Sequence, residues 1–239
     1  IKTLKTKRNI TIFEKEDVRD LFLTNEYAKI TTNKKTIVSK LIIAADGKFG
    51  SLKKILNTKQ ITKNYDHAAF VANFNHSKDH KNTAYEIFYK SGPLAILPMI
   101  KTSKNFYSSS LIWTNEKEYV NNLNLVNTEL KKDIIEEKLY KYVGSILNIV
   151  DTKLFSLSAH INKKFYDKRL IYIGDSAHSI HPIAGQGWNV GVRDIENILN
   201  VITSAEKIGF DIGSKKVCKD YNDLSFNDAF SLFQITDKL

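Results

Sequence analysis

Residues 169–194 read RLIYIGDSAHSIHPIAGQGWNVGVRD, and this stretch decides the fold. An apolar run from Arg169 to Ile173 leads directly into Gly174-Asp175, and a glycine-rich segment then leads into residues with helical apolar spacing. A buried strand that ends in an acidic residue, followed by a glycine-rich loop and a helix, is typical of a cofactor-binding α/β domain. The stretch therefore predicts an α/β fold with a cofactor at the carboxyl end of this strand.

Each residue type in this window suits one part of such a site. The Asp175 carboxylate can accept hydrogen bonds from sugar or ribitol hydroxyls, while Gly185 and Gly187 let the backbone approach a flat ring closely. The free amides at the helix start, near Trp188 and Asn189, carry about half a positive charge and favour an anionic group. Nothing in the window resembles a hydrolytic triad.

A second short pattern lies far upstream. The compact apolar run from Leu41 to Ala45 ends in Asp46-Gly47, and Ser51 to Leu56 can start a short helix. Alone, the Asp-Gly pair would be an ordinary turn. The buried strand before it, together with Asp175 downstream, favours a second contribution to the same cofactor site.

The rest of the chain predicts a small meander, an antiparallel sheet and helices. The expected strands are Ile10–Phe13, Leu21–Leu23, Tyr27–Thr31, Thr36–Val38, Ala68–Phe74, Ala84–Tyr89, Leu94–Ile100, Phe106–Trp113 and Leu154–Ile161. Apolar spacing predicts helices over Leu130–Leu147, around Ile195–Ile202 and over Phe226–Leu239. We expect three segments: a partial cofactor domain (1–60), a β-sheet substrate domain with a closing helix (61–153), and the rest of the cofactor domain (154–239).

The chain resembles the ubiquinone-biosynthesis FAD-dependent aromatic hydroxylases, which are flavin monooxygenases of the p-hydroxybenzoate-hydroxylase type. The stretch from His181 to Asp194 resembles their signature, and Gly174 to His178 resembles the motif whose aspartate holds the ribitol chain of FAD. The resemblance implies an FAD-binding Rossmann-like domain with an inserted antiparallel substrate sheet. The cofactor-binding residues that we expect are Asp46, Gly47, Gly174, Asp175, Pro182, Ala184, Gly185, Gln186, Gly187, Trp188 and Asn189.

The chain departs from the family pattern in two places. Its Ala45-Asp46-Gly47 resembles the family's middle motif, near the FAD pyrophosphate and associated with NADPH, but Gly50 replaces a serine and Lys53 an arginine. These departures weaken any assignment of pyridine-nucleotide contacts there. No GxGxxG follows a strand, so we expect about a hundred preceding residues to be missing and the chain alone to bind FAD weakly. A diverged protein that has lost FAD is the alternative.

The resemblance implies a monooxygenase that uses NADPH and dioxygen to hydroxylate a prenylated phenol, a ubiquinone precursor. Such chemistry depends on the flavin, so no side chain need act as a nucleophile and the catalytic residues stay open. The apolar strand Leu94–Met99 is expected to face the flavin, and no carboxylate or cysteine set joins His178 and His181 in a metal site. A related flavoprotein with another substrate and a flavin-free binding module remain alternatives.

Composition narrows the setting. With 36 basic residues, of which 32 are lysine, the net charge is +10, but four scattered arginines do not suit base recognition and no nucleic-acid partner is expected. Loose attraction to an acidic membrane surface, and partner proteins of a quinone-biosynthesis complex, remain open. The single cysteine, Cys218, fits a reducing cytoplasm and a structural thiol.

Overall fold

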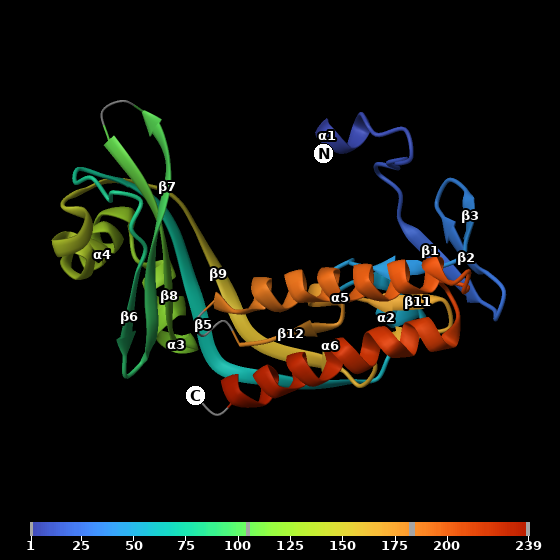
Figure 1. Cartoon of the computed structure of the whole chain (residues 1–239). Helices are drawn as coiled ribbons and strands as arrows, with labels where there is room; N and C mark the ends of the chain where they lie inside the picture. Colours follow the sequence, from blue (N-terminus) through green and yellow to red (C-terminus); the bar gives the residue numbers. More distant parts are fainter. Residues whose placement is uncertain (1, 104–105, 182–184, 238–239) are drawn as a thin grey trace. The chain divides into compact units, whose positions relative to one another are not determined.

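The chain forms two compact units in the computed structural model, which describes residues 2–103, 106–181 and 185–237 (Figure 1). The first unit comprises residues 1–62 and 159–239, and the second comprises residues 63–158. Two long strands, β5 (Gln60–His76) and β9 (Ile146–Asn162), run from one unit into the other. The boundary that we expected after residue 153, between the substrate domain and the second cofactor segment, lies inside the continuous strand β9.

The first unit contains the cofactor candidates. Its elements are α1 (Lys2–Lys5), β1 (Val18–Leu23), β2 (Ala28–Thr32), β3 (Thr36–Ser39), β4 (Ile42–Ala44), α2 (Ser51–Ile55), β10 (Tyr166–Asp167), β11 (Leu170–Tyr172), the 3₁₀ turn η1 (Gly174–Ser176), β12 (His178–Ser179), α5 (Gly187–Lys207) and α6 (Lys215–Thr236). Strands β1 to β3 form an antiparallel meander, as expected from the sequence. Residues 10–13 form no strand, because Ile10 and Phe13 are exposed and no partner strand covers them.

A parallel pair of strands fixes the position of the site. Strand β11 pairs in parallel with β4, with Leu170 opposite Ile42 and Tyr172 opposite Ala44. Two further bonds extend the pairing, from Ile42 N to the Arg169 carbonyl at 2.9 Å and from Ile173 N to the Ala44 carbonyl at 3.0 Å. Because parallel strands end at the same sheet edge, Asp46 and Asp175 are delivered to one place although 129 residues separate them in the sequence.

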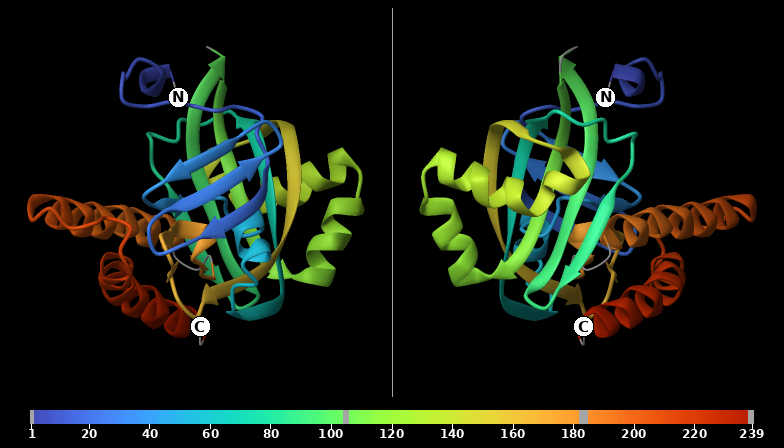
Figure 2. Two further views of the ribbon diagram at one scale, coloured as in Figure 1. Left: turned by 90° about the vertical axis from the view of Figure 1, so that its right-hand side faces the viewer. Right: turned by 90° about the vertical axis from the view of Figure 1, so that its left-hand side faces the viewer.

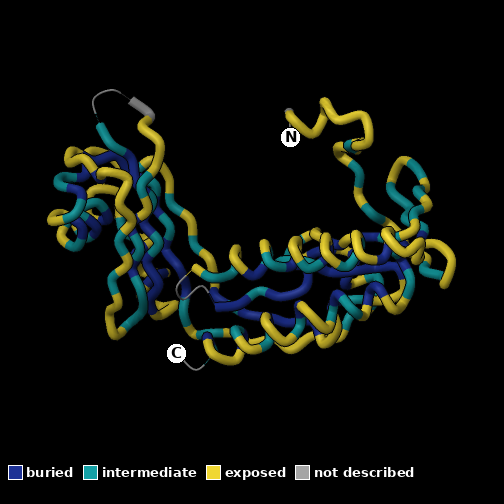
Figure 3. The backbone as a smooth tube through the Cα atoms, viewed as in Figure 1, coloured by how far each residue is buried: buried dark blue, intermediate teal, exposed yellow. Residues whose placement is uncertain are grey.

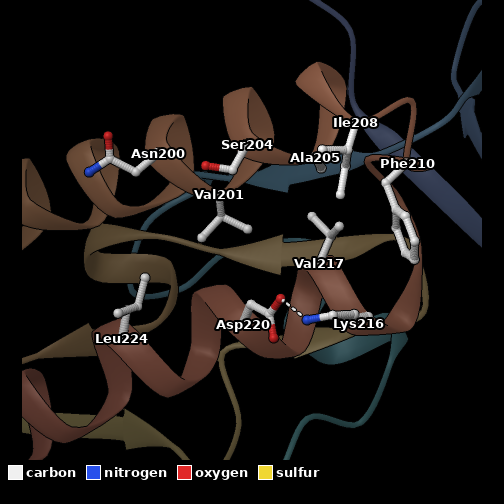
Figure 4. Close-up of a pocket in the computed structure, with 10 residues that line it drawn as sticks. All are labelled: Asn200, Val201, Ser204, Ala205, Ile208, Phe210, Lys216, Val217, Asp220 and Leu224. Carbon is white, nitrogen blue, oxygen red and sulfur yellow. Dashed lines mark hydrogen bonds and ion pairs between the residues drawn. The ribbon is translucent and has the colours of Figure 1, made fainter.

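Helices α5 and α6 lie side by side and bury one face each (Figures 1 and 2). Strand β11 is fully buried, and Figure 3 shows the outer turns of both helices as exposed. A hollow of about 360 Å³ remains between the C-terminal half of α5 and the N-terminal half of α6. Val201, Ala205, Val217 and Leu224 line it, and the Lys216–Asp220 ion pair spans 2.6 Å at its edge (Figure 4).

The second unit is an antiparallel sheet covered by two helices. Strands β6 (Tyr85–Tyr89), β7 (Gly92–Ser103) and β8 (Phe106–Glu116) join β5 and β9 in the order β9-β5-β8-β7-β6. Helices α3 (Lys117–Leu125) and α4 (Thr128–Val143) bury apolar side chains in the same core as the sheet, including Leu123 and Ile135. Among the described residues, no helix is long and apolar enough to cross a membrane.

The second unit shows two features that the sequence pattern did not indicate. The strand Leu94–Met99 does not present one apolar surface, because alternate residues point to opposite faces: Leu94 and Ile96 lie in the buried core, while Leu97 and Met99 are exposed. The helix expected over Leu130–Leu147 ends at Val143, and Ile146 already belongs to β9. Helix α3, which precedes it, was not expected.

Gly144 ends α4 for a steric and conformational reason. Its φ of 71° and ψ of −152° lie in a region that only glycine adopts without strain. A Cβ there would lie 2.6 Å from Ser77 Oγ and 3.1 Å from Lys78 Cβ.

We predict that Gly144→Ala lowers the free energy of unfolding by about 2 kcal/mol or more, since strain and a close contact add. Urea titration followed by circular dichroism measures this change. The control, Glu137→Ala at an exposed position of α4, should change stability by less than about 0.5 kcal/mol. Equal stability of Gly144→Ala and the unsubstituted protein would contradict the assignment of Gly144 as the helix stop.

Candidate functional site

The site is built where β4 and β11 end. Ser176, in the turn after β11, donates from its hydroxyl to Asp46 Oδ1 at 2.8 Å, and so joins the two segments directly. The second carboxylate oxygen of Asp46 accepts the Leu52 amide at 3.1 Å, at the start of α2. Asp46 therefore links the ends of both strands to a short helix.

Gly50 and Asp46 occupy one small space. A Cβ on Gly50 would lie 2.1 Å from the Asp46 side-chain carbon and 2.2 Å from each carboxylate oxygen. The family serine at this position could not coexist with this placement of the carboxylate without a shift. Glycine at position 50 therefore leaves the space that the Asp46 carboxylate occupies in this chain.

Lys53 is turned into the protein and is buried at 8% exposure. Its ammonium donates to the Lys48 carbonyl at 2.7 Å and lies 3.2 Å from His160 Nε2 on β9. Because an ammonium only donates, Nε2 of His160 is the accepting nitrogen. Burial first, and then the positive charges of Lys53 and Lys48, lower the pKa of His160 to about 3. Burial is also the main cause of the lowered pKa of Lys53.

Asp175 is the exposed residue of a buried turn. Its neighbours Ser176, Ala177 and His178 are all buried, whereas Asp175 is open to solvent. The attraction of Asp175 for Lys48 and Lys53 partly offsets the burial that lowers the pKa of each lysine. The turn therefore presents one carboxylate outward, beside two positive charges.

A hollow of about 470 Å³ opens at this carboxylate. It is lined by Ala45, Gly47, Ile173, Gly174, Asp175, Gly187, Trp188, Gly191, Val192 and Ile195. Trp188 is 80% exposed and Asn189 is also exposed, at the start of the long helix α5, where the unpaired amides lie. Asn189 donates to Gln186 Oε1 at 3.1 Å, so these two predicted residues are neighbours.

Three glycines with positive φ leave open space beside the backbone of this site. Gly47, Gly174 and Gly185 have φ values of 80°, 53° and 61°, and an added Cβ on any of them would meet no atom within 4 Å. Open space beside glycine backbone, next to an outward carboxylate and a helix N-terminus, fits the ribitol and ring portions of FAD. Pro182 and Ala184, which were also predicted as site residues, lie outside the described residues.

The sequence missed the partners behind this surface. His160 is buried, and no local sequence pattern indicates its contact with Lys53. The only cysteine, Cys218, is buried, and burial raises the pKa of its thiol to about 11. A buried thiol with that pKa stays protonated near neutral pH, which agrees with a structural role.

A family of known proteins matches most of the chain. The FAD binding domain family matches residues 8–207, which is most of the chain and includes both strand ends. The chain belongs to the FAD binding domain family. This membership supports FAD as the cofactor, which the family resemblance implied.

Three similar proteins are named as ubiquinone hydroxylases or monooxygenases. The chain is 29% identical to the ubiquinone hydroxylase UbiL of Rhodospirillum rubrum, over 85% of this chain and 46% of that protein. It is 25% identical to the ubiquinone hydroxylase UbiM of Neisseria meningitidis, over 97% of this chain and 49% of that protein. It is 28% identical to the human mitochondrial ubiquinone biosynthesis monooxygenase COQ6, over 85% of this chain and 50% of that protein. The chain thus spans about half the length of these relatives.

Solved structures confirm the fold class. A probable FAD-dependent monooxygenase of Pseudomonas aeruginosa, PqsL, superposes with a TM-score of 0.73 at 13% identity, covering 93% of this chain and 62% of that chain. The flavin-dependent halogenase CmlS also gives a TM-score of 0.73, at 18% identity, covering 94% of this chain and 42% of that chain. At these identities the likeness establishes the fold.

His160 should make stability depend on pH. Its pKa is about 3 in the folded protein against 6.5 for an unperturbed histidine, so between these values the unfolded state binds the extra proton. This stabilisation is present above pH 6.5 and is lost as the pH falls toward 3, at up to about 1.4 kcal/mol per pH unit.

We predict that His160→Gln flattens this slope, because glutamine can accept from Lys53 but does not titrate. Urea unfolding at a series of pH values measures it. His67→Gln, at a half-buried histidine of β5, tests the loss of an imidazole as such and should keep the slope. An unchanged slope in His160→Gln would show that His160 is not held neutral by burial and the lysines.

Proposed function

We propose that this chain forms the FAD-binding and substrate-sheet part of a monooxygenase that hydroxylates the aromatic ring of a prenylated phenol in ubiquinone biosynthesis. The proposal is supported mainly by the similarity to three proteins named as ubiquinone hydroxylases or monooxygenases, which extends over 85–97% of the chain. The arrangement of Asp46, Gly47, Gly174 and Asp175 at one sheet edge agrees with that similarity.

The chain's own residues would hold and orient the cofactor. Asp175 would accept hydrogen bonds from ribitol hydroxyls, and the amides at the start of α5, near Trp188 and Asn189, would favour negative charge on the ring. Gly174, Gly185 and Gly187 would let backbone approach the ring system. Asp46 would keep the two strand ends together through Ser176 and Leu52.

A bound flavin supplies the redox chemistry: it takes two electrons from a nicotinamide cofactor and activates dioxygen. We propose NADPH as the donor. The reaction adds one oxygen atom of dioxygen to the ring and reduces the other to water, with NADPH and a proton supplying the electrons and hydrogen. In such chemistry the protein excludes water and positions the ring, so no side-chain nucleophile is required.

The proposed prenylated substrate also suggests where in the cell the protein acts. A long isoprenoid tail partitions into membranes, and the net charge of +10 favours contact with anionic lipid. We therefore propose loose association with a membrane surface, together with partner proteins of quinone biosynthesis. The apolar side chains on the open face of β7, Ala95, Leu97 and Met99, would contact the substrate in place of the whole strand that the sequence suggested.

A second candidate is an FAD oxidoreductase of the same fold with another substrate. The flavin-dependent halogenase among the structural neighbours favours it, because the same fold carries different chemistry there. A flavin-free binding module is a third candidate. A measurement of FAD binding distinguishes the flavin-free module from the two FAD enzymes. Identification of the product distinguishes the prenylated-phenol hydroxylase from an oxidoreductase with another substrate.

We predict that Asp175→Ala raises the dissociation constant of FAD by about tenfold to a hundredfold, because one charge-assisted hydrogen bond is worth about 1.5–3 kcal/mol. Quenching of flavin fluorescence measures the affinity. The control Glu196→Ala removes an exposed carboxylate from α5 and should leave the affinity unchanged. A folded Asp175→Ala variant with unaltered affinity would refute the ribitol assignment.

We further predict that prenylated phenols supplied with NADPH and dioxygen gain one oxygen atom. Mass spectrometry with ¹⁸O-labelled dioxygen should show the label in the product. Phenols without a tail should stimulate NADPH oxidation but yield more hydrogen peroxide per product, since burial of the tail at about 25 cal/mol per Å² holds the ring in place. Oxygenation of an unrelated substrate, with none of the prenylated phenols modified, would favour the second candidate.

A further inference from the structure

Asp194 on α5 is a buried carboxylate that holds the turn after β11. Its exposed fraction is 1%, and its Oδ2 accepts the Gly174 amide at 2.9 Å. The same oxygen accepts a bond from His178 Nε2 at 2.7 Å. Because a carboxylate only accepts, Nε2 is the protonated ring nitrogen of His178. One oxygen atom thus fixes both ends of the segment Gly174–His178.

The two bonds bracket the one exposed side chain of this segment. Gly174 and His178 are anchored on either side of Asp175, while Ser176 and Ala177 between them are buried. Ser176 is held from elsewhere, by Asp46 through its hydroxyl and by Asn162 Nδ2 through its carbonyl at 3.0 Å. The backbone on both sides of Asp175 is therefore immobilised, and only its carboxylate is left to interact outward.

Neighbouring residues support Asp194 in this position. Gly191, three residues earlier and on the same face of α5, lies against the turn, where an added Cβ would make an ordinary van der Waals contact of 3.6 Å with Gly174 Cα. On the other side lies Tyr221 of α6, whose hydroxyl donates to the Tyr172 carbonyl at 2.9 Å. Burial first, and then the charge of Asp194, raise the pKa of Tyr221, which places this hydroxyl in the field of the carboxylate.

We propose that Asp194 is a positioning residue for the cofactor: through Gly174 and His178 it holds Asp175 in the orientation that binds the ribitol chain of FAD. This inference rests on the proposed contact between Asp175 and FAD. It gives a physical role to the final aspartate of the signature, Asp194, whose carboxylate accepts the bonds that hold the turn.

The variants Asp194→Leu and Asp194→Asn separate bonding from size. Leucine has a similar volume and accepts nothing, so it should raise the dissociation constant of FAD by about tenfold or more. Asparagine keeps an oxygen that can accept both bonds, so its dissociation constant should stay within about threefold of the unsubstituted value. The matched control is Asp228→Leu, which removes the exposed Arg193–Asp228 ion pair between α5 and α6 without touching the turn.

Hydrogen exchange tests the positioning without any cofactor. In the FAD-free protein, the amides of residues 174–178 should exchange at least tenfold faster in Asp194→Leu than in the unsubstituted protein. They should be unaffected in Asp228→Leu. Unchanged exchange in Asp194→Leu would overturn the proposal. Should that variant fail to fold, Asp194→Ala, which leaves room for water in place of the carboxylate, takes its place.

A double-mutant cycle with Asp175→Ala decides whether Asp194 acts through Asp175. If it does, Asp175→Ala should weaken FAD binding by less than about threefold in the Asp194→Leu background, although it weakens binding at least tenfold alone. Losses that multiply independently would overturn the proposal while leaving the FAD contact of Asp175 intact. Unchanged affinity in Asp175→Ala alone would overturn the contact itself, and this inference with it.

Discussion

The parallel pairing of β4 with β11 is the constraint on which the site depends. Three residue pairs, from Leu170–Ile42 to Tyr172–Ala44, bring together segments that are far apart in the sequence. Only because both strands run in the same direction do Asp46-Gly47 and Gly174-Asp175 emerge at one edge. At the opposite end the Arg169 guanidinium bonds the carbonyls of Lys40 and Asn25 and the carboxylate of Asp211, and so fixes where the pair begins.

Around the open surface, polar groups of separate segments bond to one another. Asp46 accepts from Ser176 and Leu52, Asp194 accepts from Gly174 and His178, and Lys53 donates to Lys48 and lies against His160. Asp194 and Lys53 are buried, and a buried polar group costs free energy unless it is bonded, so their pairings favour a single arrangement of the turns. The result is a fixed base from which the Asp175 carboxylate projects, and rigid support is what a binding carboxylate needs.

Local patterns sufficed for the parts of the fold that depend on neighbours in sequence. The apolar run before Gly174-Asp175, the similar run before Asp46-Gly47 and the apolar face of α5 each carry their own signal. Contacts over long separations do not: Lys53 and His160 are 107 residues apart, and nothing near either residue indicates the other. Helix α3 was missed because its sequence is rich in asparagine and buries only Val120 and Leu123. The alternation of β7 was available from the period of two, and it shows why Leu94 and Ile96 cannot share a face with Leu97.

The central claim is that the ends of β4 and β11 form the ribitol and ring site of FAD, with Asp175 as the outward ligand. A crystal structure of the protein with FAD bound tests it most directly. We expect the Asp175 carboxylate to lie within about 2.6–3.0 Å of a ribitol hydroxyl, the distance of a charge-assisted hydrogen bond. We also expect Gly47 and Gly174 to contact the cofactor and Asp194 to keep its bonds to Gly174 and His178. An FAD molecule bound elsewhere, with Asp175 facing solvent, would contradict the account.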